Sequence, residues 1–125
     1  MPIERIQDNV NTIRSIYRGN WTWDEFYEDQ TAVLAFLDQA ETTANMIIDL
    51  RESGSLPSGA LGHLKNIKTS THPKMNTTIL LGANMLMEIM AKMMRRLRSD
   101  MPEQKFFNTL EEALEYLEKT QPSNI

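Results

Sequence analysis

Residues 44–67 read ANMIIDLRESGSLPSGALGHLKNI and contain the strand, loop and helix from which the fold is predicted. The first seven residues form a mostly apolar run of strand length, which is typical of a central strand covered on both faces. In the loop that follows, Pro57 stands where the first turn of a helix favours proline. The apolar residues after it recur at helical spacing, at Ala60, Leu61, Leu64 and Ile67. We therefore expect a helix over 57–69.

The same alternation of strand and helix continues on both sides of this segment. The expected elements are strands 3–6 and 12–18, helix 23–39, strand 44–50, helix 57–69, strand 76–82, helix 85–99, strand 105–107 and a helix that follows Thr109. Thr22 with Glu25, and Thr109 with Glu112, have the spacing of capping boxes. The order β-β-α-β-α-β-α-β-α predicts an α/β domain with a mixed, mostly parallel sheet of about five strands and an antiparallel edge from the first hairpin.

Length, charge and composition exclude several classes of function. A chain of 125 residues fits one domain, 1–125, with a proper core. The formal net charge of −4 disfavours nucleic acid as a partner. The absence of cysteine excludes disulfides, thiolate metal sites and cysteine nucleophiles. We expect neither a secretory signal nor a transmembrane segment, and we expect residues 121–125 to form a frayed tail.

Enzyme motifs are missing from the sequence. It contains no phosphate-binding loop, no dinucleotide fingerprint and no zinc-protease or hydrolase signature. His63 and His72 stand nine residues apart with no carboxylate at metal-ligand spacing, so we expect both to be surface or loop residues. The acidic residues early in helix 23–39 are explained by the helix dipole, and nothing in the sequence indicates their burial. We therefore predict no catalytic residue, no metal and no cofactor.

Helix 85–99 is rich in methionine and ends with basic residues. An apolar stripe expected in the core is formed by Leu86, Ile89, Met90, Met93 and Leu97. Met85, Met87 and Met94 cannot all share that face, so we expect them to face a partner or lipid. Basic residues gather toward the end of the helix, at Lys92, Arg95, Arg96 and Arg98. They either offset the helix dipole or form a patch, centred on Arg95 and Arg96, for an acidic partner or anionic lipid.

The loop after strand 44–50 is the best candidate for a site because of its position. Asp49 is expected near the end of the strand, and in open α/β sheets ligands collect beyond the carboxyl ends of the strands. The alternative is purely structural, since Ser and Gly form turns and Pro starts helices.

Three segments resemble the STAS domain, the fold of bacterial anti-sigma-factor antagonists. They are MIIDLRESGSLPSGALGHL at 46–64, TTILLGANMLMEIM at 77–90 and FFNTLEEALEYL at 106–117. The resemblance covers nearly the whole chain, as a divergent pattern of elements. It implies a cytoplasmic, bacterial, non-enzymatic signalling module that binds a protein such as a kinase-type anti-sigma factor. In the family, a serine at the start of the helix after the central strand is phosphorylated to break the complex.

The chain departs from the family at the phosphorylated serine. When the sequences are aligned on Ser58-Gly59, Pro57 stands at the phosphoacceptor position and Leu56 stands at the preceding aspartate. The switch is therefore either lost or moved to a neighbouring serine. The candidates for phosphorylation or partner contact are Ser58, Ser55, Ser53, Gly59 and Asp49, of which we favour Ser58.

Three hypotheses of function follow. The first is a regulatory module that binds a protein through loop 52–59, helix 57–69 and the exposed Met side of helix 85–99. The second is a lipid-binding or small-molecule-binding domain with a pocket beside that helix, where Arg95 or Arg96 meets a head group. The third is a hydrolase or transferase with a buried acid–base pair that chain order hides.

The oligomeric state is left open by the sequence. At least one of Trp21 and Trp23 is expected to pack inward. An exposed tryptophan pair would instead mark a homodimer contact.

Overall fold

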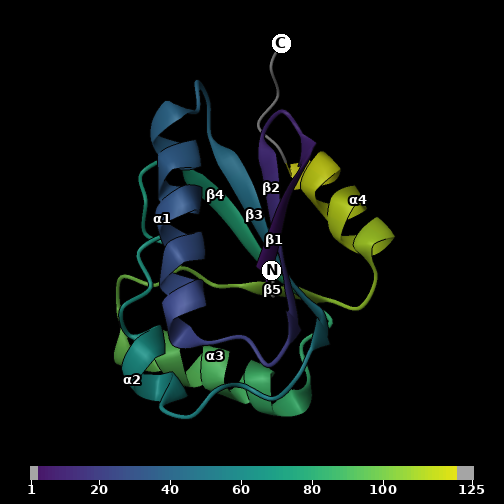
Figure 1. Cartoon of the computed structure of the whole chain (residues 1–125). Helices are drawn as coiled ribbons and strands as arrows, with labels where there is room; N and C mark the ends of the chain where they lie inside the picture. The colour runs from purple at the N-terminus through teal and green to yellow at the C-terminus, as the bar shows by residue number, and fades with distance from the viewer. Residues whose placement is uncertain (1–2, 121–125) are drawn as a thin grey trace.

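The computed structural model describes residues 3–120 and confirms the predicted order of elements (Figure 1). The elements are β1 (Ile3–Asn9), β2 (Thr12–Gly19), α1 (Trp23–Gln39), β3 (Ala44–Ser53), α2 (Ala60–Leu64), β4 (Met75–Leu81), α3 (Met85–Leu97), β5 (Lys105–Phe107) and α4 (Leu110–Thr120). The tail predicted at 121–125 lies outside the described residues. None of the helices in 3–120 has both the length and the apolar character needed to cross a membrane.

The five strands form one mixed sheet in the order β1-β2-β3-β4-β5. β1 pairs with β2 in the antiparallel sense, and every other pair is parallel, as predicted. β3 is hydrogen-bonded along both edges and lies at the centre of the sheet. This position explains the mostly apolar run in its sequence, because a central parallel strand is covered on both faces.

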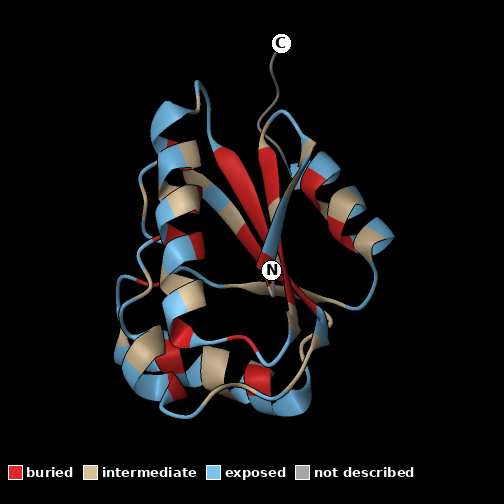
Figure 2. Ribbon diagram, viewed as in Figure 1, coloured by how far each residue is buried: buried red, intermediate tan, exposed pale blue. Residues whose placement is uncertain are grey.

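Helices cover the sheet on both faces (Figure 2). On one face α1 packs through Val33 and Leu37, and α2 and α3 cover the end of the same face around Leu50 and Leu80. On the other face α4 packs against a fully buried cluster formed by Ile47, Ile79, Leu81, Ala113 and Leu117. Alternate residues of β3 therefore face opposite layers, which is the two-residue period of a strand.

The capping signals in the sequence are confirmed where helices begin. The Thr22 hydroxyl accepts a hydrogen bond from the Glu25 backbone at 3.2 Å, and the Glu25 carboxylate accepts one from the Thr22 backbone at 2.9 Å. The Asn84 side chain likewise accepts a hydrogen bond from the Met87 backbone at 2.9 Å. These caps satisfy backbone N–H groups that lack partners within the first helical turn.

The helix predicted over 57–69 is wrong in length, because α2 contains only five residues. Gly59 precedes it with a φ of 81°, in the left-handed region, so the helical conformation cannot extend back to Pro57. Beyond Leu64 the backbone continues in tight turns, with the N–H of Asn66 bonded to the carbonyl of His63 and the N–H of Ile67 bonded to that of Leu64. β3, in turn, runs to Ser53, so Asp49 lies inside the strand and does not end it.

The side of α3 that faces the core also differs from the prediction. Met87 and Met94 are buried, with 7% and 3% of their surface exposed, although the sequence placed them outside. The residues predicted to form the core stripe are exposed, except for the half-buried Met90: Leu86, Ile89, Met93 and Leu97. Both sides of this helix are apolar, so the periodicity alone did not decide between them. Ala91 lies on the side that packs, where a small side chain allows close approach.

Candidate functional site

Loop 53–59 leaves the carboxyl end of β3 and is held at both ends by tryptophan side chains. The Trp21 indole N–H donates to the Ser53 hydroxyl at 2.8 Å, and the Trp23 indole N–H donates to the Ser58 carbonyl at 2.8 Å. Both indoles are buried, which confirms the prediction that at least one of them packs inward and contradicts the alternative of an exposed tryptophan pair as a dimer contact. We call Trp21 and Trp23 the indole clamp. It fixes the inner side of the loop while the outer side faces solvent.

The three candidate serines differ in their surroundings. Ser53 is half-buried, and its hydroxyl both accepts from Trp21 and donates to the Gly54 carbonyl at 2.9 Å. Ser55 and Ser58 are exposed, and within residues 3–120 neither hydroxyl forms a hydrogen bond. The loop therefore presents Ser55 and Ser58 to solvent and uses Ser53 for its own structure.

Leu56 and Ala60 anchor the middle of the loop and the start of α2. Ala60 is buried, and Leu56 packs against the core cluster that contains both tryptophans. Gly59, between them, is exposed. With its inner residues packed, this loop would lose little conformational entropy in any contact made by its outer surface.

His63 is not the surface residue that the sequence predicted. Its ring stacks on Trp23 with centroids 4.8 Å apart and planes at 18°, and its Nδ1 lies 2.8 Å from the Tyr27 hydroxyl. The Asn66 side-chain amide donates to the same hydroxyl at 3.1 Å. Sequence reasoning missed this contact because its partners are 36 residues apart and only the fold brings them together. His63 thus joins α2 to α1.

Asp49 is a candidate site residue that the structure places away from the loop surface. It is 1% exposed on the α4 face of the sheet, and its carboxylate accepts hydrogen bonds from Arg14 at 3.0 Å and from Arg51 at 2.8 Å. Arg14 also binds Asp8. Burial would raise the pKa of Asp49, but the hydrogen bonds from the Arg51 side chain and backbone and from Arg14 outweigh burial and hold that pKa below its ordinary value of 3.8. A buried, doubly neutralised carboxylate holds strands together and is not available to a partner.

A second buried carboxylate is Asp29 of α1, whose burial nothing in the sequence indicated. It is 1% exposed and accepts hydrogen bonds from Arg5 at 2.9 Å, from the Ser15 hydroxyl at 3.0 Å and from the Tyr17 hydroxyl at 3.1 Å. Burial, followed by the charge of Asp29, raises the pKa of Tyr17 well above 10.0. Both carboxylate oxygens are therefore occupied by protein donors, and Tyr17 stays protonated at neutral pH.

His72 lies in a loop, as predicted, but it contacts a carboxylate that its sequence neighbourhood does not contain. Its Nε2 lies 2.8 Å from Asp38, whose side chain is 71% exposed. The Lys74 backbone N–H donates to Nδ1 at 3.0 Å, so the neutral ring donates from Nε2. This pair is at the surface and not in a cleft. Among residues 3–120, no three His, Asp or Glu side chains converge as a metal site would require.

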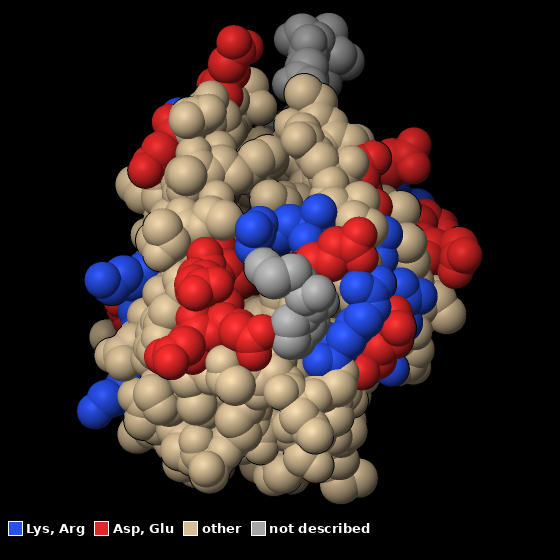
Figure 3. All heavy atoms as spheres, viewed as in Figure 1, with Lys and Arg blue, Asp and Glu red and all other residues tan. Residues whose placement is uncertain are grey.

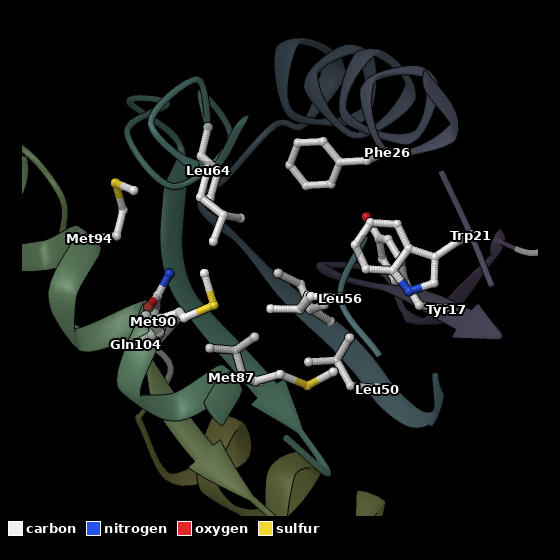
Figure 4. Close-up of a pocket in the computed structure, with 14 residues that line it drawn as sticks. Tyr17, Trp21, Phe26, Leu50, Leu56, Leu64, Met87, Met90, Met94 and Gln104 are labelled. Carbon is white, nitrogen blue, oxygen red and sulfur yellow. The ribbon is translucent and has the colours of Figure 1, made fainter. Parts of the chain in front are cut away.

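An apolar cavity of about 80 Å³ lies where the sequence predicted a pocket, between the methionine-rich helix and the sheet (Figure 4). Met87, Met90 and Met94 from α3 form one side, and Leu56 and Leu64 close it from the loop and α2. Pockets for drug-sized ligands have volumes of about 300–1,000 Å³. In this conformation the cavity holds only a small apolar group.

Arg95 and Arg96 do not reach the cavity. They line a separate surface groove of about 350 Å³ between α3 and β5, together with Lys92 and Glu103. Arg95 forms an exposed ion pair with Glu103 at 3.5 Å. Gln104 lines both spaces. The sequence predicted one pocket with an arginine beside it. The structure instead has two separate spaces, the apolar cavity and the groove lined by the arginines.

The fold is similar to that of an uncharacterised protein of the DUF3478 family from Shewanella loihica, which has a SpoIIAA-like fold. The two structures superpose with a TM-score of 0.60 at 24% sequence identity, over 92% of this chain and 90% of that chain. The chain matches no protein-family model, and no curated protein is significantly similar to it.

The SpoIIAA-like fold is the fold of STAS domains and anti-sigma-factor antagonists. The resemblance drawn from the sequence is thus confirmed at the level of the fold.

Proposed function

We propose that this protein is a non-enzymatic regulatory module that binds a protein partner through the outer surface of loop 53–59 and α2. The main support is the loop itself, which exposes Ser55 and Ser58 while the indole clamp fixes its inner side. The SpoIIAA-like fold agrees with this role. By analogy with that fold, the partner is a signalling protein such as a kinase-type anti-sigma factor, and the location is the cytoplasm.

Ser58 is the residue we propose for regulation by phosphorylation. A phosphoryl group adds about 1.5 to 2 negative charges, and on this exposed hydroxyl they would face the partner directly. α2 has only five residues, so its dipole gives such a group little support. The effect therefore arises at the partner's surface, by repulsion or by loss of fit.

An affinity pull-down from the source cell, read by mass spectrometry, tests both parts of the proposal. It identifies the proteins retained by the wild-type chain and any phosphorylated serine. We expect Ser58→Glu to weaken binding of the retained protein by about tenfold or more, and Ser58→Ala to change it by less than about threefold. Ser99→Glu, at an exposed serine outside the loop, is the matched control. Equal binding by both Ser58 variants removes Ser58 from the mechanism.

The cavity beside α3 supports a second candidate function, the binding of a small apolar molecule. Met side chains line it, and methionine adapts its shape at little strain, so the space can enlarge around a ligand. Native mass spectrometry of the purified chain would reveal a co-purifying ligand, and thermal shifts would report binding of added lipids. Absence of both results would reject this candidate.

The hydrolase or transferase hypothesis requires a buried acid–base pair, and the surroundings of Asp29 do not support one. The buried carboxylate Asp29 accepts hydrogen bonds from Arg5, Ser15 and Tyr17, so both of its oxygens are engaged within the protein.

A further inference from the structure

The outward side of α3 carries an apolar surface that the rest of the described chain leaves uncovered. We call it the outer stripe: Met85, Leu86, Ile89, Met93 and Leu97, which are 77%, 59%, 48%, 41% and 70% exposed. Leu61 of the neighbouring α2 adds to it at 38%. Isolated exposed apolar side chains are ordinary, but five on one side of one helix form a contiguous patch that marks an interaction surface.

Cations border the outer stripe along one side. Lys92 and Arg96 follow Ile89 and Met93 by three residues and so lie next to them on the helix surface. Within residues 3–120 neither of these cations forms an ion pair. α3 contains three basic residues and one acidic residue, Glu88, a balance of +2 (3 − 1) in a chain whose net charge is −4. The positive charge is thus concentrated beside the apolar surface.

The opposite side of α3 packs against the core of the protein. Met87, Met90 and Met94 face the sheet and line the apolar cavity, so the two sides of the helix have separate roles. In Figure 3 the lowest part of the molecule, over α2 and α3, is free of charged side chains from this side.

We propose that the outer stripe docks this protein on an anionic phospholipid surface. Apolar side chains of such a helix enter the boundary between head groups and acyl chains, while basic side chains at its border meet the phosphates. The stripe is about 20 Å long, since α3 has 13 residues. The helix would lie along the membrane surface with Lys92 and Arg96 at head-group level.

The charges favour a lipid surface over a second copy of the chain. A symmetric contact in which two copies of α3 pack antiparallel across the stripe would bring Lys92 close to its own copy, and like charges repel. The stripe is also convex, whereas a protein that takes up a helix supplies a groove of matching shape. A fluid bilayer needs no such match, and the exposed methionines adapt to it.

Vesicle co-sedimentation tests this docking with the chain as it exists. We expect it to bind phosphatidylcholine vesicles that contain roughly one-third phosphatidylglycerol, and to bind pure phosphatidylcholine vesicles at least about tenfold more weakly. Lys92→Glu with Arg96→Glu should lower binding to anionic vesicles by about tenfold or more. Leu86→Ser with Leu97→Ser should lower it by a similar factor.

Matched controls separate the stripe from general effects of charge and hydrophobicity. Lys68→Glu with Lys119→Glu makes the same change in net charge at exposed residues outside α3. Val10→Ser removes an apolar side chain that is 85% exposed at the tip of the β1–β2 hairpin. Both controls should bind anionic vesicles within about twofold of the wild type. Circular dichroism and thermal unfolding confirm that each variant is folded.

A fluorescent probe gives an independent measure of insertion. The chain has no cysteine, so Ile89→Cys and Val10→Cys can each be labelled at a single position with an environment-sensitive dye. Anionic vesicles should shift the emission of the probe at 89 to shorter wavelength and leave the probe at 10 unchanged.

Three results would overturn the proposal. They are failure of the wild type to bind anionic vesicles, binding that both α3 double variants retain, and a concentration-dependent dimer in sedimentation velocity that Leu86→Ser with Leu97→Ser abolishes. Ser58→Glu should leave vesicle binding unchanged, so the outcome is independent of the proposed protein partner.

Discussion

At the scale of single residues, Asp49 shows how a buried charge becomes part of the sheet. Its carboxylate is neutralised by Arg14 from β2 and by Arg51 from its own strand. Asp49→Asn would leave both guanidinium groups without this partner, although Arg14 keeps Asp8. We expect the variant to lose roughly 3 kcal/mol of unfolding free energy, measured by urea denaturation. Glu41→Gln, at an exposed position, should change it by less than about 0.5 kcal/mol.

The pH dependence of stability follows from the same residue. Because the pKa of Asp49 is lower in the folded state, its contribution is fully present above the unfolded value of 3.8 and is lost as pH falls through the folded value. Urea denaturation between neutral pH and pH about 3 should show a loss of wild-type stability that is smaller in Asp49→Asn. Equal acid sensitivity of the two proteins would contradict this role for Asp49.

Two glycines offer a matched test of local backbone requirements. Gly82 has a φ of 73°, and a Cβ there would lie 2.5 Å from Cγ of Arg51 and 3.1 Å from its Cα. Gly82→Ala should therefore destabilise the protein by more than about 1 kcal/mol. Gly62 lies in α2 with open space around the same atom, so Gly62→Ala should stabilise it by up to about 1 kcal/mol. Thermal unfolding of both variants would show opposite shifts in Tm.

At the scale of elements, α3 carries methionines on both its buried and its exposed side. The side on which a methionine lies should decide how much it contributes to stability. Met87→Ala and Met94→Ala remove buried side chains, and each should lower the unfolding free energy by about 2–5 kcal/mol. Met85→Ala and Met93→Ala make the same chemical change on the exposed side and should alter it by less than about 0.5 kcal/mol. Similar losses in all four variants, measured by urea denaturation, would show that α3 packs through a different side.

Local patterns predict where a helix or strand occurs better than they predict its partners. The capping boxes at Thr22 and Thr109 place two helix starts correctly, because each depends on residues three apart. The length of α2 was missed because Gly59 adopts a left-handed conformation that a sequence pattern does not reveal. The indole clamp and the His63 stack were missed because they join residues more than 30 positions apart.

At the scale of the whole molecule, the protection of backbone amides from hydrogen exchange should fall from the centre of the sheet to its edges. β3 is paired on both sides and covered on both faces, whereas β5 has three residues and α2 has five. Hydrogen exchange measured by mass spectrometry should be slowest in β3 and β4 and fastest in β5 and α2. Protection of α2 equal to that of β3 would mean that the indole clamp and the His63 contact hold α2 more firmly than its length suggests.

The α/β architecture and the mixed sheet were predictable as a whole because strands and helices alternate along the chain after an initial hairpin of two strands. The candidate site was predictable only in its position. Loop 53–59 could be placed at the carboxyl end of β3, but the hydrogen bonds that leave Ser55 and Ser58 exposed and occupy Ser53 depend on Trp21 and Trp23. Such tertiary hydrogen bonds decide which side chains of a loop remain accessible.

The position of α4 has a consequence for synthesis on the ribosome. Ile47, Ile79 and Leu81 are completely enclosed only by packing against Ala113 and Leu117, which are translated after every strand of the sheet. A nascent polypeptide that has emerged only as far as Phe107 therefore exposes one apolar face of its sheet to solvent. Chaperone capture or degradation of a prematurely terminated chain would begin at this face.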